Sequence, residues 1–113
     1  MAPQRFFGSQ LLKGTTPLLV LTVIGEGQLY GYEIAQKIRE RSGGAFAPSE
    51  GSLYPALHRL EQAGLITSTW RTSETSRRAR FYQLTAQGRR ELKSEEENWE
   101  AVTGAVTRVL QFT

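Results

Sequence analysis

The sequence predicts a mainly α-helical fold with a small β-hairpin, in the order helix, helix, helix, hairpin and long last helix. In three segments before residue 64, apolar residues either fill the segment or recur at helical spacing. Between residues 66 and 84, two runs of strand-forming residues flank a polar tip. After residue 85, apolar residues spaced by seven continue almost to residue 111.

The first two helices are indicated by their start signals and their apolar content. Thr16 followed by Pro17 favours a helix start, because a hydroxyl can cap the helix and proline tolerates the first turn. The residues from there to Ile24 are almost all apolar, so we expect this helix to be buried. Residues 1–12 would then form an arm. The second helix is predicted over residues 32–41 by its apolar stripe.

The third helix is predicted to start between Ser49 and Ser52 and to run to Ala63. Pro55 favours a start near Ser52, because proline belongs in the first turn of a helix. Gly64 is well placed as the left-handed residue that ends it. One face is apolar and would join the core: Leu53, Ala56, Leu57 and Leu60. The other face would remain free: Tyr54, Pro55, His58, Arg59 and Gln62.

The hairpin is predicted over residues 66–84, with a polar tip at residues 72–76. A basic run follows the tip directly and consists of Arg77, Arg78 and Arg80. Because a lone two-stranded hairpin is only marginally stable in water, we expect Trp70 and Leu84 to pack onto the helices.

The last helix is predicted from Thr85 to about Gln111. Its short, imperfect apolar seam combines two sets spaced by seven, with Glu95 as its weak point: Leu92, Trp99 and Val106, and Glu95, Val102 and Val109. Since this seam is longer than the core available beneath it, we favour a dimer contact over packing within one chain. The expected dimer interface comprises Leu92, Trp99, Val102, Val106, Val109 and Leu110.

The charges are unevenly distributed along the chain. Residues 1–90 carry 12 Lys and Arg and 6 Glu, whereas residues 91–113 carry 2 and 5. Of the 14 positive side chains 11 are Arg, whose planar fork suits phosphate and guanine. This distribution favours nucleic acid as a partner, while a well-solvated basic surface is the alternative that charge alone leaves open.

The inventory of reactive side chains argues against catalysis and metal binding. The chain has no Cys and no Asp, and His58 is its single histidine. Thiolate chemistry, a Ser-His-Asp triad and a multi-histidine metal site are therefore excluded, although two Glu could still pair. We expect no enzyme activity, no cofactor and no metal. The longest apolar run, residues 17–24, is too short to span a membrane and no secretion leader is indicated, so we expect a cytoplasmic protein.

Three helices followed by a hairpin are typical of a winged helix-turn-helix, whose third helix enters the DNA major groove. Residues 13–85 would form this domain, and residues 86–113 would form the dimerisation helix. The expected DNA contacts are Tyr54, Pro55, His58 and Arg59 from the helix, and Arg77, Arg78 and Arg80 from the hairpin. Short residues at 51 and 52 would let the DNA backbone approach. Plain alternatives are helix packing for Tyr54 and surface solvation for the others.

One stretch is specific: residues 51–61 read Gly-Ser-Leu-Tyr-Pro-Ala-Leu-His-Arg-Leu-Glu. With the shorter stretches 30–34, 64–66 and 80–85, the chain resembles the PadR-like transcriptional regulators. The resemblance implies a winged helix with a C-terminal dimerisation helix, which binds a palindromic operator and usually represses transcription. It also implies DNA contacts at Ser52, Tyr54, Pro55 and His58. Half-sites for such a dimer lie roughly 34–36 Å apart.

The chain departs from the family at the hairpin tip, where Glu74 and several Ser and Thr stand in place of Gly and basic residues. Its C-terminal part has room for one helix, as in the small members. The resemblance implies that such members accept planar hydrophobic compounds, here between two copies of Trp99, although ordinary packing is the plainer role for a tryptophan. An alternative function for the whole chain is a winged-helix protein-interaction or dimerisation module without DNA binding.

Overall fold

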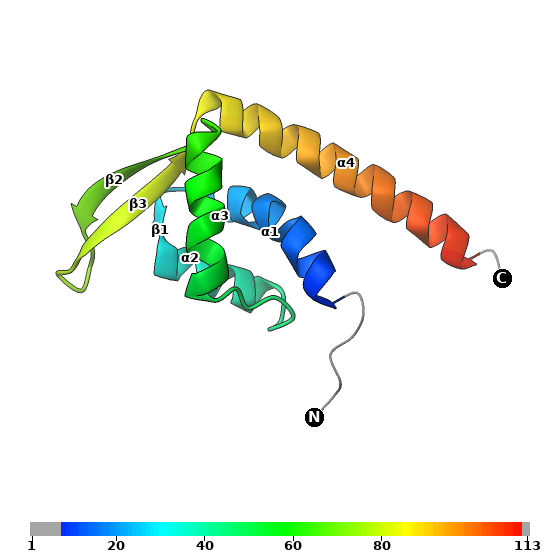
Figure 1. Cartoon of the computed structure of the whole chain (residues 1–113), viewed down its shortest axis with the longest axis horizontal. Coiled ribbons are helices and arrows are strands. Elements are labelled where there is room, and N and C mark those ends of the chain that lie inside the picture. Colours follow the sequence, from blue (N-terminus) through cyan, green and yellow to red (C-terminus); the bar gives the residue numbers. More distant parts are fainter. Residues whose placement is uncertain (1–7, 112–113) are drawn as a thin grey trace.

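The computed structural model describes residues 8–111. Helices dominate these residues, and they are joined by a small three-stranded antiparallel sheet, two strands of which lie between the third and fourth helix in the sequence (Figure 1). The elements in order are α1 (Gly8–Ile24), β1 (Leu29–Tyr30), α2 (Gly31–Arg41), α3 (Glu50–Gln62), β2 (Ile66–Thr72), β3 (Arg78–Leu84) and α4 (Ala86–Gln111). The order of helices, hairpin and long last helix confirms the predicted fold class.

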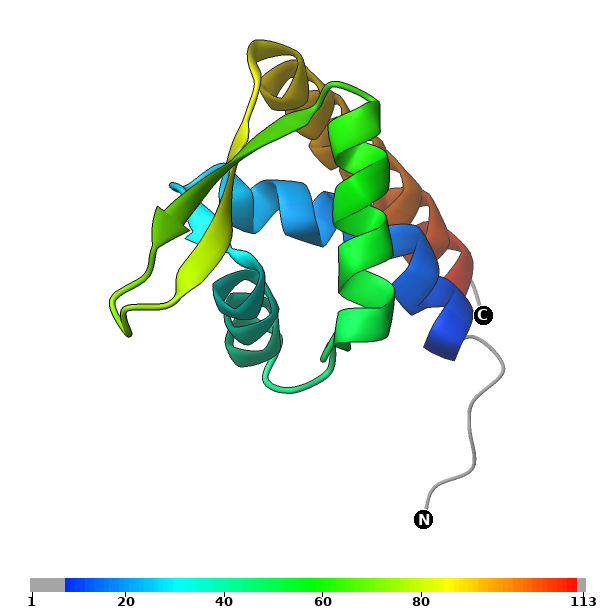
Figure 2. The same ribbon diagram turned by 60° about the vertical axis from the view of Figure 1, so that its left-hand side comes forward.

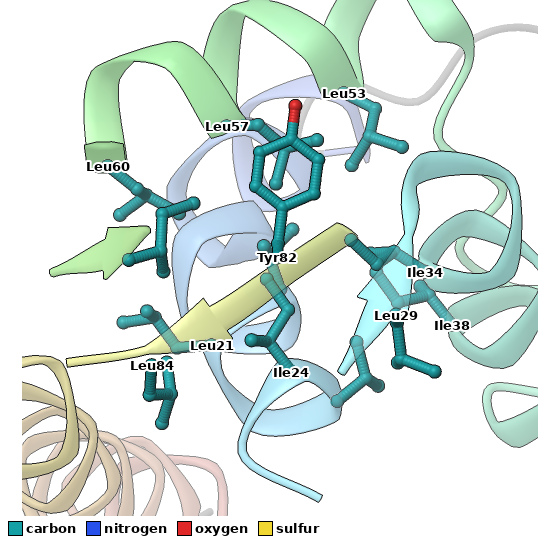
Figure 3. Close-up of a cluster of buried hydrophobic side chains, with 13 residues drawn as sticks. Leu21, Ile24, Leu29, Ile34, Ile38, Leu53, Leu57, Leu60, Tyr82 and Leu84 are labelled. Carbon is teal, nitrogen blue, oxygen red and sulfur yellow. The ribbon is translucent and has the colours of Figure 1, made fainter. Parts of the chain in front are cut away.

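Helix α1 supplies the centre of the hydrophobic core. Val20, Leu21 and Ile24 are at most 2% exposed, as the apolar run predicted. Every other element except α4 adds side chains that are buried against them: Leu29, Ile34, Ile38, Leu53, Leu57, Leu60, Ile66, Tyr82 and Leu84 (Figure 3). Each Leu or Ile buried in this way stabilises the fold by roughly 1.5–3 kcal/mol. Helix α3 is therefore held by its leucine face, which fixes the direction of its other face.

The sheet has the strand order β1-β3-β2, and both pairings are antiparallel. Trp70 lies opposite Arg80 in the β2–β3 pair, and Leu29 lies opposite Tyr82 in the β1–β3 pair. In two views of the molecule, the hairpin of β2 and β3 projects beyond the helices (Figures 1 and 2). We refer to residues 66–84, which form this hairpin, as the wing. Strand β1 was not predicted.

The predicted start of the first helix is wrong, whereas the third helix begins within its predicted range, nearer Ser49 than Ser52. Helix α1 begins at Gly8, so Pro17 lies inside it, and residues 8–12 of the expected arm are helical. Helix α3 begins at Glu50 with Ser49 as its cap, so Pro55 also lies inside a helix. Proline in a helix costs one backbone hydrogen bond, and the apolar residues that follow each proline are buried, which offsets that cost. The remaining seven residues of the expected arm lie outside the described residues.

The start of α4 is fastened to the end of α3 through Thr85. The hydroxyl of Thr85 donates to the Gly64 carbonyl over 2.7 Å, and its backbone N–H donates to the Leu65 carbonyl over 3.0 Å. The same hydroxyl accepts from the Gly88 backbone N–H over 2.9 Å, so Thr85 also caps α4. Gly64 has a φ of +79°, which confirms the predicted left-handed end of α3.

Beyond this junction α4 runs back alongside α1, and its far end lies on the side where α1 begins (Figures 1 and 2). Only Gly88 among its residues is buried, although Leu92 packs partly against the core. Most of α4 therefore extends from the body with little cover. Within residues 8–111, this helix and the others all fall short of the length and apolar content that a bilayer crossing needs.

Candidate nucleic-acid interface

Helix α3 presents a free surface opposite its leucine face. The Ser49 side chain caps the helix by accepting from the Ser52 backbone N–H over 3.3 Å. Leu53, Leu57 and other apolar residues of α3 are buried, and the predicted contact residues are all exposed: Ser52, Tyr54, Pro55, His58 and Arg59. This division follows from the 3.6-residue period, because a helix that buries positions 53, 56, 57 and 60 must expose positions 54, 55, 58 and 59.

Tyr54 does not stand out freely from α3, because its ring lies against the first turn of α2. A Cβ atom at Gly31 would lie 2.7 Å from the Tyr54 hydroxyl oxygen, so this close approach depends on glycine. Tyr54 nevertheless remains 46% exposed. The tyrosine is thus oriented by its neighbour while the residue remains partly accessible.

Two basic residues of the wing, Arg78 and Arg80, lie on the side of the wing that faces α3. Strand alternation puts Trp70, Arg78 and Arg80 on one face of the hairpin, and this is the face that turns toward α3 at the base of the wing. The guanidinium carbons of Arg78 and Arg80 lie 5.8 and 5.9 Å from the centre of the Trp70 ring. At these distances both cations are attracted to the ring face.

The expectation that Trp70 packs onto the helices is wrong, because this side chain is 58% exposed. Its parity along β2 matches that of buried Ile66, so alternation correctly predicts its face. By the register, however, Trp70 lies in the half of the hairpin nearer the tip, and the hairpin projects beyond the helices (Figure 1). Leu84, at the base of the wing, is buried as predicted.

A hollow of about 380 Å³ lies between α3 and the wing. It is lined by Tyr30, Gly31, Tyr54, Trp70, Arg78, Ala79, Arg80 and Tyr82. Tyrosines from β1, α3 and β3 and two arginines from β3 therefore border one open space. Such a lining can donate several hydrogen bonds to an anion and can offer ring faces beside it.

Arg80 has partners that Arg78 lacks. Its Nε donates to the Ser68 hydroxyl over 2.7 Å, and that hydroxyl donates to the Glu61 carboxylate over 2.7 Å. Its Nη2 also lies 3.6 Å from the same carboxylate oxygen. Among the described residues, Arg77 and Arg78 form no ion pair.

The tip of the wing is a tight turn. The Ser73 carbonyl accepts from the Ser76 N–H over 2.9 Å, and the Ser73 N–H donates to the Arg77 carbonyl over 2.7 Å. Ser76 has a φ of +63°, which lies in the left-handed region. Hairpin turns of this kind usually have glycine at such a position. Arg77 and Arg78 follow this turn directly, so its geometry sets the direction in which they leave it.

Tyr82 stands under the hollow and joins it to the core. Its ring extends from β3 toward α3 between Leu53 and Leu57 (Figure 3). Burial raises the pKa of the Tyr82 hydroxyl above its ordinary value of 10.0; the Arg80 guanidinium opposes this shift and the Glu61 carboxylate adds to it. Tyr82 is thus a neutral hydroxyl at neutral pH.

The predicted seam of α4 divides into two parts. Leu92 packs partly against the core of its own chain. The rest of the predicted seam lies in the open, with exposed fractions from 44% to 73%: Trp99, Val102, Val106, Val109 and Leu110. Apolar residues gathered on one side of a projecting helix are unusual on a monomer surface.

Three features of the site escaped the sequence analysis: the exposure of Trp70, the partners of Arg80 and the contact of Gly31 with Tyr54. Strand β1, which brings Tyr30 and Gly31 to the hollow, has two residues, which is too short for any periodic pattern. The strand pairing that brings Ser68 near Arg80 could have been found by aligning the two runs about the polar tip.

A three-helix body with a free face on α3 and a basic wing beside it defines the class of winged-helix DNA-binding proteins. The family model described as the transcriptional regulator PadR-like family matches residues 20–94, which include α3 and the whole wing. The chain belongs to this family, which is one of transcriptional regulators and not of enzymes.

Solved structures of PadR-like regulators have the same fold. A PadR-like transcriptional regulator from Bacillus cereus is 33% identical, with a TM-score of 0.81 over 92% of this chain and 99% of that one. A transcriptional regulator from Clostridium thermocellum is 32% identical, with a TM-score of 0.80 over 88% of this chain and 94% of that one.

Curated relatives differ in length. The negative transcriptional regulator PadR of Bacillus subtilis is 30% identical over 73 residues, which are 65% of this chain and 40% of that protein. An uncharacterized protein from Lysinibacillus sphaericus is 29% identical over 83% of this chain and 86% of its own length. The chain therefore spans less than half of the Bacillus subtilis regulator but most of the other protein.

Proposed function

We propose that this PadR-like regulator is a repressor that binds a palindromic operator as a homodimer in the cytoplasm. The observation that carries the proposal is the common orientation of two elements: α3 exposes Tyr54, Pro55 and His58, and the wing turns Arg78 to the same side. In this arrangement α3 enters the major groove and the wing contacts the flanking backbone. The repressor role is supported by the Bacillus subtilis relative, which is described as a negative regulator.

In this proposal each element of the surface has a distinct role. Ser52, beside the open position of Gly51, lets the DNA backbone approach the first turn of α3. The Tyr54 hydroxyl donates to a phosphate, while Pro55, His58 and Arg59 face the base edges or the groove wall. Arg77 and Arg78 neutralise phosphates beside the groove, and Arg80 lies two residues further from the tip than Arg78.

The homodimer is supported by the exposed apolar row of α4. One chain leaves Trp99, Val102 and Val106 about half exposed, and a second copy of α4 would cover them. A two-fold dimer would then present two copies of α3 to half-sites roughly 34–36 Å apart. The same row suggests a site for an effector: a planar hydrophobic compound could bind between two copies of Trp99 near the dyad.

DNA binding is tested by fluorescence anisotropy, with a duplex that the wild-type protein selects from a random-sequence pool. We expect affinity to fall steeply with salt, and Arg78→Ala to reduce the logarithmic salt slope by about 0.9, the contribution of one phosphate contact. Arg71→Ala is the matched control, because its guanidinium lies over Phe81 on the opposite face of the wing. If the binding of the wild-type protein does not depend on salt, the result instead favours the alternative function, a protein-interaction module without DNA binding.

The dimer is tested by light scattering coupled to size-exclusion chromatography. Val106→Glu, which puts a charge into the exposed row, should produce monomers, whereas Ala101→Glu on the other side of α4 should leave the dimer intact. The effector site is tested by quenching of tryptophan fluorescence with planar dyes. Quenching that persists in Trp99→Phe, where Trp70 is the only tryptophan, would rule out the site.

A further inference from the structure

We propose that Glu61, Ser68 and Arg80 form a latch that sets the angle between the wing and α3. In this assignment Arg80 is a positioning residue, and the phosphate contacts of the wing come from its neighbours Arg77 and Arg78. The inference rests on the proposed DNA binding and adds to it, because it separates the basic residues of one run into two functions.

The first support is a continuous chain of hydrogen bonds across three elements. Arg80 of β3 donates to Ser68 of β2, and Ser68 donates to Glu61 near the end of α3, with both distances 2.7 Å. The Ser68 hydroxyl has one proton to donate, and the chain uses it on the carboxylate while the oxygen accepts from Arg80. Both strands of the wing are thereby tied to the recognition helix at one point.

The second support is the position of this point along the wing. Below it, Tyr82 and Leu84 are buried against the helices. Toward the tip, Thr72 and Arg78 are exposed on the same face of the hairpin, and Trp70, opposite Arg80, is exposed as well. The latch therefore lies where the wing leaves the body, and a small change of angle there moves Arg77 and Arg78 at the far end by a larger distance.

The third support is electrostatic. The Arg80 guanidinium already faces the Glu61 carboxylate at 3.6 Å, so a phosphate would have to compete with an anion that is part of the same chain. Arg78 has no carboxylate partner among the described residues, and it is held by the Trp70 ring instead. Arg78 is therefore the cation available to DNA.

Glu61→Gln separates the two roles, because they predict effects of opposite sign. If Arg80 is simply a DNA contact, removal of the nearby anion should strengthen binding to a polyanion. If the latch positions the wing, Glu61→Gln should weaken binding to the selected duplex by about 5-fold to 10-fold, whereas binding to a random-sequence duplex should not weaken, because the charge removed is negative. Arg80→Gln should weaken specific binding to a similar extent without lowering the salt slope.

Three further variants complete the experiment. The double variant Glu61→Gln/Arg80→Gln should bind no more weakly than either single variant, since one latch is lost in all three. Ser68→Ala should behave like them, and Ser68→Thr, which retains the hydroxyl, should bind as the wild type does. Thermal unfolding checks that every variant is folded.

The latch is overturned if Glu61→Gln binds the selected duplex more tightly, or if Arg80→Gln lowers the salt slope by about one. It is equally overturned if the effects of the two single variants add in the double variant. Failure of the proposed function looks different, because the wild-type protein itself would then show no salt-dependent binding to any duplex.

Discussion

At the scale of single residues, the interface depends on side chains that orient other side chains. Gly31 leaves space for the Tyr54 ring, Trp70 provides a surface for Arg78, and Ser68 links Arg80 to Glu61. Each supporting residue lies on a different helix or strand from the residue that it orients. A contact surface built in this way is sensitive to substitutions that never touch the ligand.

Gly31→Ala tests this dependence at one atom. The added Cβ would lie 2.7 Å from the Tyr54 hydroxyl oxygen, so the ring must move away. Gly31 is the first residue of α2 and has no positive φ, so alanine is tolerated by the backbone and the free energy of unfolding should change by less than about 1 kcal/mol. We expect weaker binding to the selected duplex in fluorescence anisotropy. Unaltered affinity would show that the orientation of Tyr54 is unimportant.

At the scale of elements, the end of α3 and the start of α4 meet in a close backbone contact. Thr85 bonds to both carbonyls that follow α3, and a Cβ at Gly88 would lie 2.0 Å from the Leu65 carbonyl oxygen. Backbone atoms cannot move aside as the end of a flexible side chain can. The first turn of α4 is thus packed directly on the loop that ends α3.

Gly88→Ala should therefore destabilise the fold by about 2 kcal/mol or more, because the helix or the loop must shift. Gly104→Ala in the same helix is the control. There the nearest atom to an added Cβ is the end of the Arg108 side chain at 3.7 Å, so the higher helix propensity of alanine should stabilise the fold by up to about 1 kcal/mol. Urea unfolding measures both changes, and effects of equal sign would contradict the prediction.

The sequence predicts long elements better than short ones or those that depend on distant partners. The leucine face of α3 and its exposed contact residues follow from one helical period, and the wing follows from its strand-forming runs. Strand β1 could not be predicted, because two residues carry no period and their pairing depends on β3, some fifty residues further along. The start of α1 was missed since Pro17 indicates a first turn by local preference, whereas burial of the following residues decides where the helix forms.

At the scale of the whole molecule, core and interface share Tyr82. Its ring is 5% exposed among the leucines of α3, and its hydroxyl lies near Arg80 and Glu61. The residue therefore contributes to folding and lies beneath the surface proposed to bind DNA. Its raised pKa makes the stability of the fold depend on pH in the alkaline range.

The sign of this dependence follows from the two states of the chain. Above about pH 10 an unfolded chain loses the Tyr82 proton, whereas the folded chain retains it until the higher folded-state pKa is passed. The contribution of Tyr82 to the free energy of unfolding is therefore complete below this range. It should be lost as pH rises through it, so the free energy of unfolding should fall. Urea unfolding between about pH 8 and about pH 11 should show a smaller fall for Tyr82→Phe. Parallel curves for the two proteins would remove Tyr82 as the cause.

The close junction of α3 and α4 has a mechanical consequence for the proposed control by an effector. At 1.5 Å per residue, α4 is about 39 Å long and α3 about 20 Å. If the two turn together, a shift of about 3 Å at the far tip of α4 corresponds to a rotation of roughly 4°, which moves the front of α3 by only about 1.5 Å. A displacement at the tip of α4 is therefore reduced to about half its size at the front of α3, where the proposed DNA groove would lie.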